Sequence, residues 1–244
     1  MIFAAGLGTR LKPLTDTMPK ALVPLAGKPL LQWQVEKLRD AGITDIIVNV
    51  HHFPDQIIET IHRNNGWGCT ITISDERDEL LDTGGGLKKA LHHTPYTLHH
   101  TPILACNVDI LSNIDLRALI AEYERTGVSQ LVVSERETQR YLCFDQNNCL
   151  CGWTNITTGE VRPATLSAML GGFSHLAFSG MQILNPDALV RLQNVQAKKF
   201  SLIDFYLDCM NAVPLQAYIP QNYRMMDVGK INQIGEAQHF AENL

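Results

Sequence analysis

The chain has 244 residues, of which 45% are hydrophobic, so it is long enough to bury one large core. Its net charge of −5 provides no basic field of the kind that attracts nucleic acid, and no apolar stretch approaches the roughly 20 residues needed to span a bilayer. Six cysteines without a Cys-x-x-Cys pair, and a start without a signal-peptide pattern, favour reduced thiols. We expect a cytoplasmic protein that binds neither nucleic acid nor a membrane.

The first half of the chain alternates between predicted strands and predicted helices. Runs of β-branched and apolar residues predict buried strands at 2–5, 45–50, 70–74 and 103–106. Apolar residues at helical spacing predict helices at 29–41, 54–62, 84–91 and 115–126. Strands separated by helices of this length imply right-handed crossovers and a mostly parallel sheet, whose ligands bind outside the carboxyl ends of the strands.

The second half has a different pattern, with short strands on both sides of an Asn147-Asn148 turn. Strands are predicted at 130–134, 141–145, 150–153, 176–184 and 215–219. Helices are predicted from Pro186 onward, at 201–210 and at 231–240. The sequence has no low-complexity linker and no internal repeat. We therefore expect one α/β domain over residues 1–244, with a three-layer, Rossmann-like fold around a mixed, mostly parallel sheet.

The first predicted strand ends in a glycine loop, Gly6-Leu7-Gly8-Thr9-Arg10, and Lys20 follows ten residues after the arginine. Gly6 and Gly8 can adopt positive φ, and the N–H groups of such a loop can converge on phosphate oxygens. Arg10 offers a planar fork of donors, and Lys20 offers a movable point charge. Together these residues predict a binding site for a triphosphate.

Two familiar phosphate loops do not match this segment, because Leu11 stands where the Walker pattern and the dinucleotide pattern each need a glycine. A Gly-x-Gly pair alone is equally typical of an ordinary turn after a strand. The longer string is Gly6-x-Gly8-Thr9-Arg10-x-x-Pro13-x-Thr15-x-x-x-Pro19-Lys20, followed by Pro24 and Gly27-Lys28-Pro29. It resembles the signature of the sugar-1-phosphate nucleotidyltransferases.

That resemblance implies an enzyme that condenses a nucleoside triphosphate with a sugar 1-phosphate to give a nucleotide sugar and pyrophosphate. It implies the nucleotide-diphospho-sugar transferase type of fold, with residues 1–130 as the nucleotide-binding half and residues 131–244 as a more β-rich sugar-phosphate-binding half. No C-terminal β-helix pattern follows the second half. The implied catalytic residues are Arg10, Lys20 and Asp109. We expect a monomer or a small homo-oligomer.

Two aspartates are candidates for holding Mg²⁺, which keeps several waters and uses one or two protein carboxylates. Asp109 follows the predicted strand at 103–106, and Asp227 lies in Met226-Asp227-Val228-Gly229. Taken alone, each is as typical of a turn or a helix cap. The family resemblance implies that both bind the metal, although Val108 replaces the usual glycine before Asp109 and Met225 stands where tryptophan is common.

The other site residues are implied by the same resemblance. The nucleotide-binding set is Ala5, Gly6, Gly8, Thr9, Arg10, Asp82, Thr83, Gly84 and Gly85. The sugar-phosphate-binding set is Lys20, Asn107 and Gly180. Many relatives also have a Glu-Lys-Pro lysine for the sugar phosphate, which is missing here. Lys20, Arg140 and Arg162 are the alternatives that the sequence offers.

The base and the sugar remain open in the sequence. The Thr83-Gly84-Gly85-Gly86 form is most similar to the N-acetylmuramic acid 1-phosphate uridylyltransferase branch, which favours UTP. Glu76 could accept hydrogen bonds from guanine, so a mannose- or heptose-1-phosphate guanylyltransferase is an alternative. A choline-phosphate cytidylyltransferase is another, and a non-catalytic nucleotide-sugar sensor is a third. A sensor is expected to lose at least one charged site residue. Here the four charged residues, Arg10, Lys20, Asp109 and Asp227, are all present.

Overall fold

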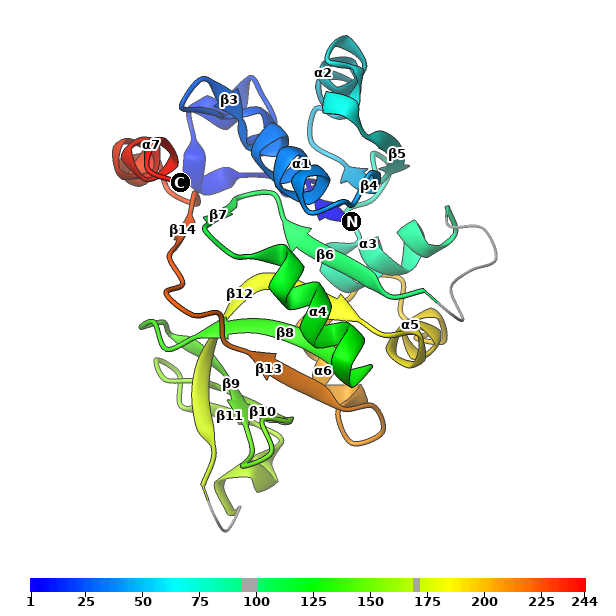
Figure 1. Ribbon diagram of the computed structural model, residues 1–244, viewed down its shortest axis with the longest axis vertical. Coiled ribbons are helices and arrows are strands. Elements are labelled where there is room, and N and C mark those ends of the chain that lie inside the picture. Colours follow the sequence, from blue (N-terminus) through cyan, green and yellow to red (C-terminus); the bar gives the residue numbers. More distant parts are fainter. Residues whose placement is uncertain (94–100, 169–171) are drawn as a thin grey trace.

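The computed structural model describes residues 1–93, 101–168 and 172–244. Within these residues the main sheet has ten strands (Figure 1). They are β1 (Ile2–Phe3), β4 (Asp45–Val50), β5 (Thr70–Asp75), β6 (Ile103–Asn107), β8 (Ser129–Ser134), β9 (Arg140–Phe144), β10 (Leu150–Asn155), β11 (Glu160–Arg162), β12 (Ser174–Leu184) and β13 (Leu215–Tyr218). Their order is β11-β10-β9-β12-β6-β1-β4-β5, and β8 joins β12 to β13.

The predicted parallel core of the sheet is confirmed. β6, β1, β4 and β5 are parallel neighbours, with Ile2 of β1 opposite both Cys106 of β6 and Val48 of β4. β12 runs antiparallel to β6 and connects this core to the antiparallel strands β9, β10 and β11. The sheet is therefore mixed, and its β-rich end belongs to the second half of the chain, as the sequence pattern predicts.

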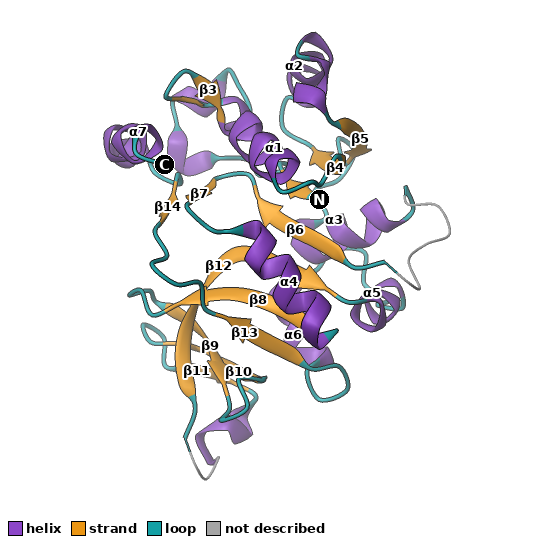
Figure 2. Cartoon of the chain, in the orientation of Figure 1, coloured by secondary structure: helices purple, strands orange, loops and turns teal. Residues whose placement is uncertain are grey.

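Helices cover the sheet on both faces and give the expected three layers (Figure 2). The helices are α1 (Leu30–Asp40), α2 (Pro54–Arg63), α3 (Asp82–Leu91), α4 (Leu116–Thr126), α5 (Pro186–Gln193), α6 (Leu202–Cys209) and α7 (Ile234–Glu242). One apolar core joins α1, α2, α4 and α7 to the sheet, and a second joins α3, α5 and α6. Ile2 belongs to the first core and its neighbour Phe3 to the second, since successive strand residues point to opposite faces.

Two short strand pairs were missed by the sequence analysis. One is the hairpin of β2 (Pro24–Leu25) and β3 (Lys28–Pro29), which lies directly before α1. The other pairs β7 (Ile110–Ser112) with β14 (Met225–Asp227) in antiparallel register. Strands of two or three residues are too short for an alternating pattern, so periodicity gives no signal for them. The second pair matters for the site, because its two strands carry the chain just past Asp109 and up to Asp227.

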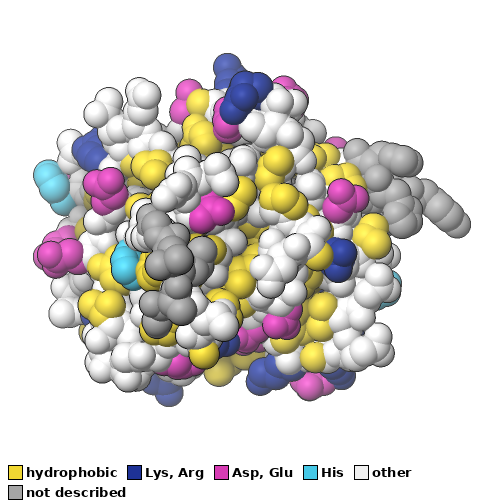
Figure 3. Space-filling model, turned by 90° about the horizontal axis from the view of Figure 1, so that it is seen from below, with side chains coloured by type: hydrophobic (Ala, Val, Ile, Leu, Met, Phe, Trp, Pro, Cys, Tyr) yellow, Lys and Arg dark blue, Asp and Glu magenta, His cyan; other side chains and the backbone are white. Residues whose placement is uncertain are grey.

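The surface and the thiols agree with the composition. In the face that Figure 3 shows, outside the grey residues, acidic side chains are interspersed among the Lys and Arg side chains. All six cysteines lie within the described residues and are free thiols. Among the helices that the structure describes, none combines the length and the apolar character needed to cross a membrane.

Candidate active site

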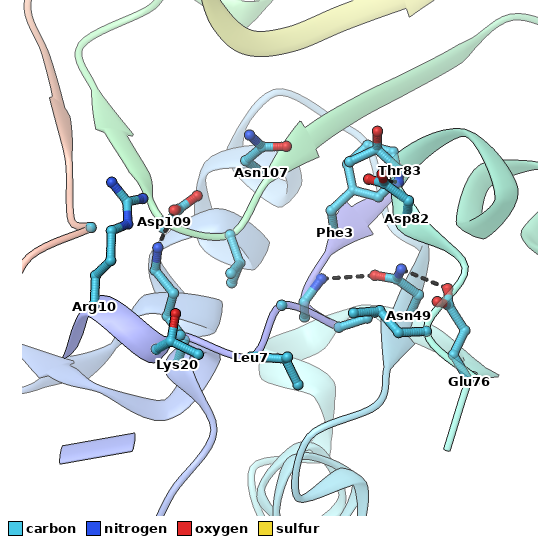
Figure 4. A pocket seen from close by; sticks show the side chains of 18 of the residues that line it. Phe3, Leu7, Arg10, Lys20, Asn49, Glu76, Asp82, Thr83, Asn107 and Asp109 are labelled. Carbon is cyan, nitrogen blue, oxygen red and sulfur yellow. Dashed lines mark hydrogen bonds and ion pairs between the residues drawn. The ribbon is translucent and has the colours of Figure 1, made fainter. Parts of the chain in front are cut away.

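A cleft of about 530 Å³ opens where β1, β4 and β6 end, at the edge of the sheet predicted for ligands (Figure 4). Ten of the predicted site residues line it: Ala5, Gly6, Gly8, Thr9, Arg10, Lys20, Asp82, Thr83, Asn107 and Asp109. They come from segments as far apart as residues 5 and 109. The structure therefore brings most of the predicted nucleotide site together at one place.

The glycine loop is shaped by Gly8. Gly8 has φ +63°, and its carbonyl oxygen accepts from the Thr15 hydroxyl at 2.8 Å and from the Leu11 amide at 2.8 Å. A Cβ on Gly8 would lie 2.8 Å from Thr15 Cγ2 and 3.0 Å from Lys20 Cβ. Gly6, in contrast, has no positive φ and open space where a Cβ would stand. Only one of the two glycines therefore uses the conformational freedom that the sequence suggested for both.

This difference predicts the stability of two matched variants. Gly8→Ala should lower the free energy of unfolding by about 1–3 kcal/mol, because alanine is strained at positive φ and its methyl group meets Thr15 and Lys20. Gly6→Ala should change it by less than about 1 kcal/mol. Urea unfolding followed by circular dichroism measures both. Equal losses in the two variants would contradict this account of the loop.

Lys20 and Asp109 form an ion pair in the cleft (Figure 4). Lys20 follows Pro19 at the start of a short 3-10 turn and is only 9% exposed, while Asp109 follows β6. The Lys20 ammonium group donates to Asp109 Oδ2. A lysine held this way lies beside the carboxylate expected to bind the metal, so one side chain can serve both the metal site and a phosphate.

β14 brings Asp227 to the edge of the cleft, where Gly229, two residues later, is a lining residue and Asp227 is not. β14 pairs with β7 so that Asp227 lies opposite Ile110, and the Val228 amide donates to the Asp109 carbonyl oxygen at 2.9 Å. Asp227 is exposed as a residue, but desolvation of its carboxyl group by the surrounding protein atoms raises the pKa above its ordinary value, and the Asp109 charge raises it further. The charges of Lys20, Arg10 and Arg136 oppose that rise. The two predicted carboxylates are thus close enough to repel each other.

Arg10 reaches this pair from the glycine loop. A Cβ on Gly229 would lie 2.7 Å from Asp227 Oδ1 and 2.9 Å from Arg10 Nη2, so the carboxylate and the guanidinium group both lie beside this glycine. Figure 4 shows Arg10 next to Asp109 on the same side of the cleft. The close approach explains the glycine two residues after Asp227, which the sequence pattern alone does not.

Helix α1 supports the carboxylate pair through two residues that the sequence analysis did not identify. Gln34, which is buried, donates to the Ile110 carbonyl oxygen at 2.6 Å. Lys37, one turn later, donates to the Ser112 carbonyl oxygen and, at 3.1 Å, to the Ser112 hydroxyl. Burial lowers the pKa of Lys37 to about 8. These donors satisfy carbonyl groups of β7, whose backbone pairs with β14.

Gln34 should therefore contribute measurably to stability. We expect Gln34→Leu to lower the free energy of unfolding by about 1–3 kcal/mol, because it leaves the buried Ile110 carbonyl without this donor. The matched control is Gln32→Leu on the same helix, where the side chain bonds to Glu36 at 2.8 Å in a half-buried position. Urea unfolding compares the two. A control loss as large as that of Gln34→Leu would remove the special role of Gln34.

A buried chain of hydrogen bonds forms the opposite side of the cleft (Figure 4). The Ala4 amide donates to Asn49 Oδ1 at 2.7 Å, and Asn49 Nδ2 donates to Glu76 Oε1 at 2.7 Å. The Leu81 amide donates to Glu76 Oε2 at 3.2 Å. Burial raises the pKa of the Glu76 carboxyl group. Both of its oxygens already accept from the protein, which weakens the suggestion that Glu76 is there to bind guanine.

Asn49 is a third residue that the sequence analysis missed. It is buried at the end of the apolar strand β4, and its side chain continues the sheet's hydrogen bonding past the last residue of β1. A polar residue in an otherwise apolar strand was the signal that could have identified it, because a buried polar group needs a partner.

The Asp82–Gly86 segment starts α3 and contributes to the cleft unevenly. Asp82 and Thr83 line the cleft, and the Thr83 hydroxyl accepts from the Leu202 amide at 2.9 Å. The amides of Gly84 and Gly85 both donate to the Phe200 carbonyl oxygen, at 2.9 and 3.2 Å. These two glycines do not line the cleft. Their missing side chains instead let α3 pack directly against residues 198–200.

Gly180 lies beside Asn107, another residue of the predicted sugar-phosphate-binding set. It has φ +67°, and a Cβ would lie 2.7 Å from Asn107 Nδ2. The register of β12 against β8 shifts between Phe178 and Gln182, so Gly180 sits in an irregularity of the strand. Asn107 lines the cleft, and Gly180 does not line it but packs against Asn107.

The chain belongs to the nucleotidyl transferase family, whose pattern matches residues 1–243. It is 41% identical to an N-acetylmuramate alpha-1-phosphate uridylyltransferase of Neisseria meningitidis serogroup B, over 99% of this chain and 97% of that protein. It is 34% identical to a mannose-1-phosphate guanyltransferase of Debaryomyces hansenii, over 56% of this chain and only 37% of the relative. The fold matches a UDP-glucose pyrophosphorylase from Acinetobacter baumannii with a TM-score of 0.77 at 17% identity, covering 99% of this chain and 92% of that one.

Proposed function

We propose that this protein transfers a uridylyl group from UTP to N-acetylmuramic acid 1-phosphate, giving the nucleotide sugar and pyrophosphate. The observation that carries the proposal is the cleft itself, in which Arg10, Lys20 and Asp109 come together at the carboxyl ends of the parallel strands, with Asp227 beside it. The full-length similarity to a uridylyltransferase of the same substrate supports the choice of base and sugar.

The chemistry needs charge and positioning more than acid–base catalysis. An oxygen of the sugar phosphate forms a bond to the α-phosphorus of UTP, the bond from that phosphorus to the bridging oxygen of the β-phosphate breaks, and its electrons leave with pyrophosphate. Arg10 and the amides of the glycine loop neutralise the β- and γ-phosphates. Lys20 stabilises the charge that grows on the α-phosphate, in a site where water is largely displaced.

Asp109 and Asp227 would hold Mg²⁺. Two neighbouring carboxylates that repel each other are a donor set that gains from a divalent cation, and Mg²⁺ keeps waters and phosphate oxygens as its other ligands. Within the described residues no group of three His, Cys, Asp or Glu side chains could hold a metal by itself, which is consistent with a metal shared with substrate. When bound, the ion would neutralise phosphate charge and orient the triphosphate.

The proposal extends to the organisation of the chain. Residues 1–130, with the glycine loop and Asp109, would form the nucleotide-binding half, and residues 131–244 would form the sugar-phosphate-binding half with Gly180. Asp82 and Thr83 would border the nucleoside. We place the enzyme in the cytoplasm, where its six free thiols stay reduced, as a monomer or small homo-oligomer.

The second candidate is a guanylyltransferase that uses mannose 1-phosphate, supported by the similarity over 56% of this chain to the Debaryomyces hansenii enzyme. One experiment distinguishes the two candidate functions. Pyrophosphate release with Mg²⁺ is measured for UTP, GTP, CTP and dTTP against a panel of N-acetylmuramic acid 1-phosphate, N-acetylglucosamine 1-phosphate, mannose 1-phosphate and phosphocholine. Turnover of UTP with N-acetylmuramic acid 1-phosphate is expected. Faster turnover of GTP with mannose 1-phosphate would replace the main proposal, and silence with every pair would favour a non-catalytic sensor.

A further inference from the structure

The sugar side of the cleft needs a cation that the nucleotide side does not supply. This inference rests on the proposed function, in which both substrates are phosphate esters. Lys20 is paired with Asp109, and Arg10 approaches Asp227 from the glycine loop. Both belong to the first twenty residues and act on the triphosphate in the proposed function, although the family resemblance also assigns Lys20 to the sugar phosphate. A dianionic sugar phosphate arriving from the β12 side would still need a donor of its own.

The two arginines suggested by the sequence are poorly placed for this role. Arg162 donates to Asp204 at 2.8 Å, and its guanidinium group lies 4.6 Å from the centre of the Trp153 ring. It is therefore engaged within the β-rich end of the molecule. Arg140 opens β9, where it lies opposite Asn155 of β10 and is exposed.

Arg136 is hydrogen-bonded to β12, the strand that carries Gly180. It follows β8 by two residues, and its Nη2 donates to the Phe178 carbonyl oxygen of β12 at 2.9 Å. Gly180, two residues beyond Phe178, abuts Asn107 of the cleft. Two residues span at most about 7 Å of chain, so the guanidinium group is anchored within reach of the sugar side.

Arg136 also lies beside the segment that leads to Asp227, which includes Tyr223 and β14. Arg136, Tyr223 and Met225 border a hollow of about 470 Å³. The arginine thus stands between β12 and the strand that delivers Asp227.

Most of the donors of Arg136 remain available. A guanidinium group has five N–H donors, and with the described residues Arg136 forms the single hydrogen bond to Phe178 and no ion pair. Glu135 borders the same hollow without pairing with it among those residues. An anchored, exposed guanidinium with free N–H groups is suited to bidentate binding of an oxyanion.

We propose that Arg136 binds an anionic group of the sugar substrate and replaces the lysine missing from the hairpin segment. The anion is either the phosphate, which every sugar 1-phosphate carries, or a carboxylate on the sugar, which N-acetylmuramic acid carries and N-acetylglucosamine does not. Both sources use the same chemistry, a planar fork of donors on two oxygens.

The test is steady-state kinetics of Arg136→Ala with the nucleotide and sugar pair that the wild-type protein turns over. We expect KM for the sugar substrate to rise about 10- to 100-fold, the value of a charge-assisted hydrogen bond, with KM for the nucleotide changed less than about threefold. Arg136→Lys keeps the positive charge but loses the planar pair of donors, so its KM for the sugar substrate should lie between those of the wild type and Arg136→Ala. The unfolding midpoint should stay unchanged, because the side chain is exposed.

Two sugars identify the anion. An equal rise for N-acetylmuramic acid 1-phosphate and N-acetylglucosamine 1-phosphate, measured as KM or as an inhibition constant, assigns Arg136 to the phosphate. A rise for the first alone assigns it to the carboxylate. The matched control is Arg191→Ala, which changes an exposed arginine of α5. Its KM values for both sugars should equal those of the wild type.

The proposal is overturned if Arg136→Ala leaves the sugar KM unchanged, if the nucleotide KM rises as much, or if Arg140→Ala produces the effect instead. A different base or sugar preference in the wild type would refute the proposed function and not this inference, because every sugar 1-phosphate carries the phosphate.

Discussion

We expect Lys20→Ala to lower kcat by roughly 10²–10³-fold, the usual cost of removing one preorganised charge from a phosphoryl or acyl transition state. Lys20 is 9% exposed and held against Asp109, so its charge acts where water is largely displaced. The effect should fall mainly on kcat, because the charge on the α-phosphate grows as the reaction proceeds. Steady-state kinetics with saturating nucleotide and sugar phosphate measures it.

A matched control separates catalysis from loop folding. Lys12 lies in the same loop, where it pairs with Asp16 at 3.0 Å and is mostly exposed. Lys12→Ala should keep nearly wild-type kcat. Equilibrium nucleotide binding should survive in Lys20→Ala, since Arg10 and the loop amides remain. Near-normal product formation by Lys20→Ala would refute the proposed role of Lys20, and loss of the folded structure would show that Lys20 is needed for folding as well.

The part of the site that could be predicted from the sequence lies in short, contiguous segments. The strand, the Gly6–Arg10 loop and Lys20 follow one another within twenty residues, and Asp109 directly follows a clear apolar strand. Because parallel strands end at one edge of the sheet, these pieces could be brought together by reasoning on the order of strands. Their meeting in one cleft agrees with that expectation.

The remaining part depends on pairings between distant segments. Asp227 reaches Asp109 only because β14 pairs with β7 across more than a hundred residues, and neither strand is long enough to show periodicity. Gln34 and Lys37 looked like polar positions on an amphipathic helix. Their role appears only when the carbonyl groups of β7 are found beside them. A buried acceptor decides which polar residue is needed, and sequence spacing does not reveal that acceptor.

Asp227→Asn should separate activity from stability. We expect it to lower kcat roughly 10²–10³-fold, because it removes one of two carboxylates proposed to hold the metal, whose stabilisation of the transition state is worth several kcal/mol. In metal-free buffer at neutral pH it should also raise the unfolding midpoint, by a small amount because Asp227 is exposed and solvent screens its charge. Desolvation of the carboxyl group and the Asp109 charge raise the pKa of Asp227, so the ionised form is less favourable in the folded chain than in the unfolded chain.

The pH dependence fixes the sign of the stability effect. As pH rises from the ordinary aspartate pKa of about 3.9 through the raised folded pKa, the unfolded chain loses this proton first, and the folded state becomes less stable. The penalty is complete at neutral pH and absent below the ordinary pKa. The gain in midpoint of Asp227→Asn should therefore shrink as pH falls toward that value.

Added Mg²⁺ should reverse the order of the unfolding midpoints of the wild-type protein and Asp227→Asn. At neutral pH the metal should raise the unfolding midpoint of the wild-type protein, which keeps both carboxylates, and have little effect on Asp227→Asn. Thermal unfolding with and without Mg²⁺, at neutral pH and at about pH 4, measures both effects. Asp208→Asn, which changes an exposed aspartate on α6, is the matched control. A variant that is fully active, or one destabilised in metal-free buffer at neutral pH, would show that Asp227 is not held as a strained metal ligand.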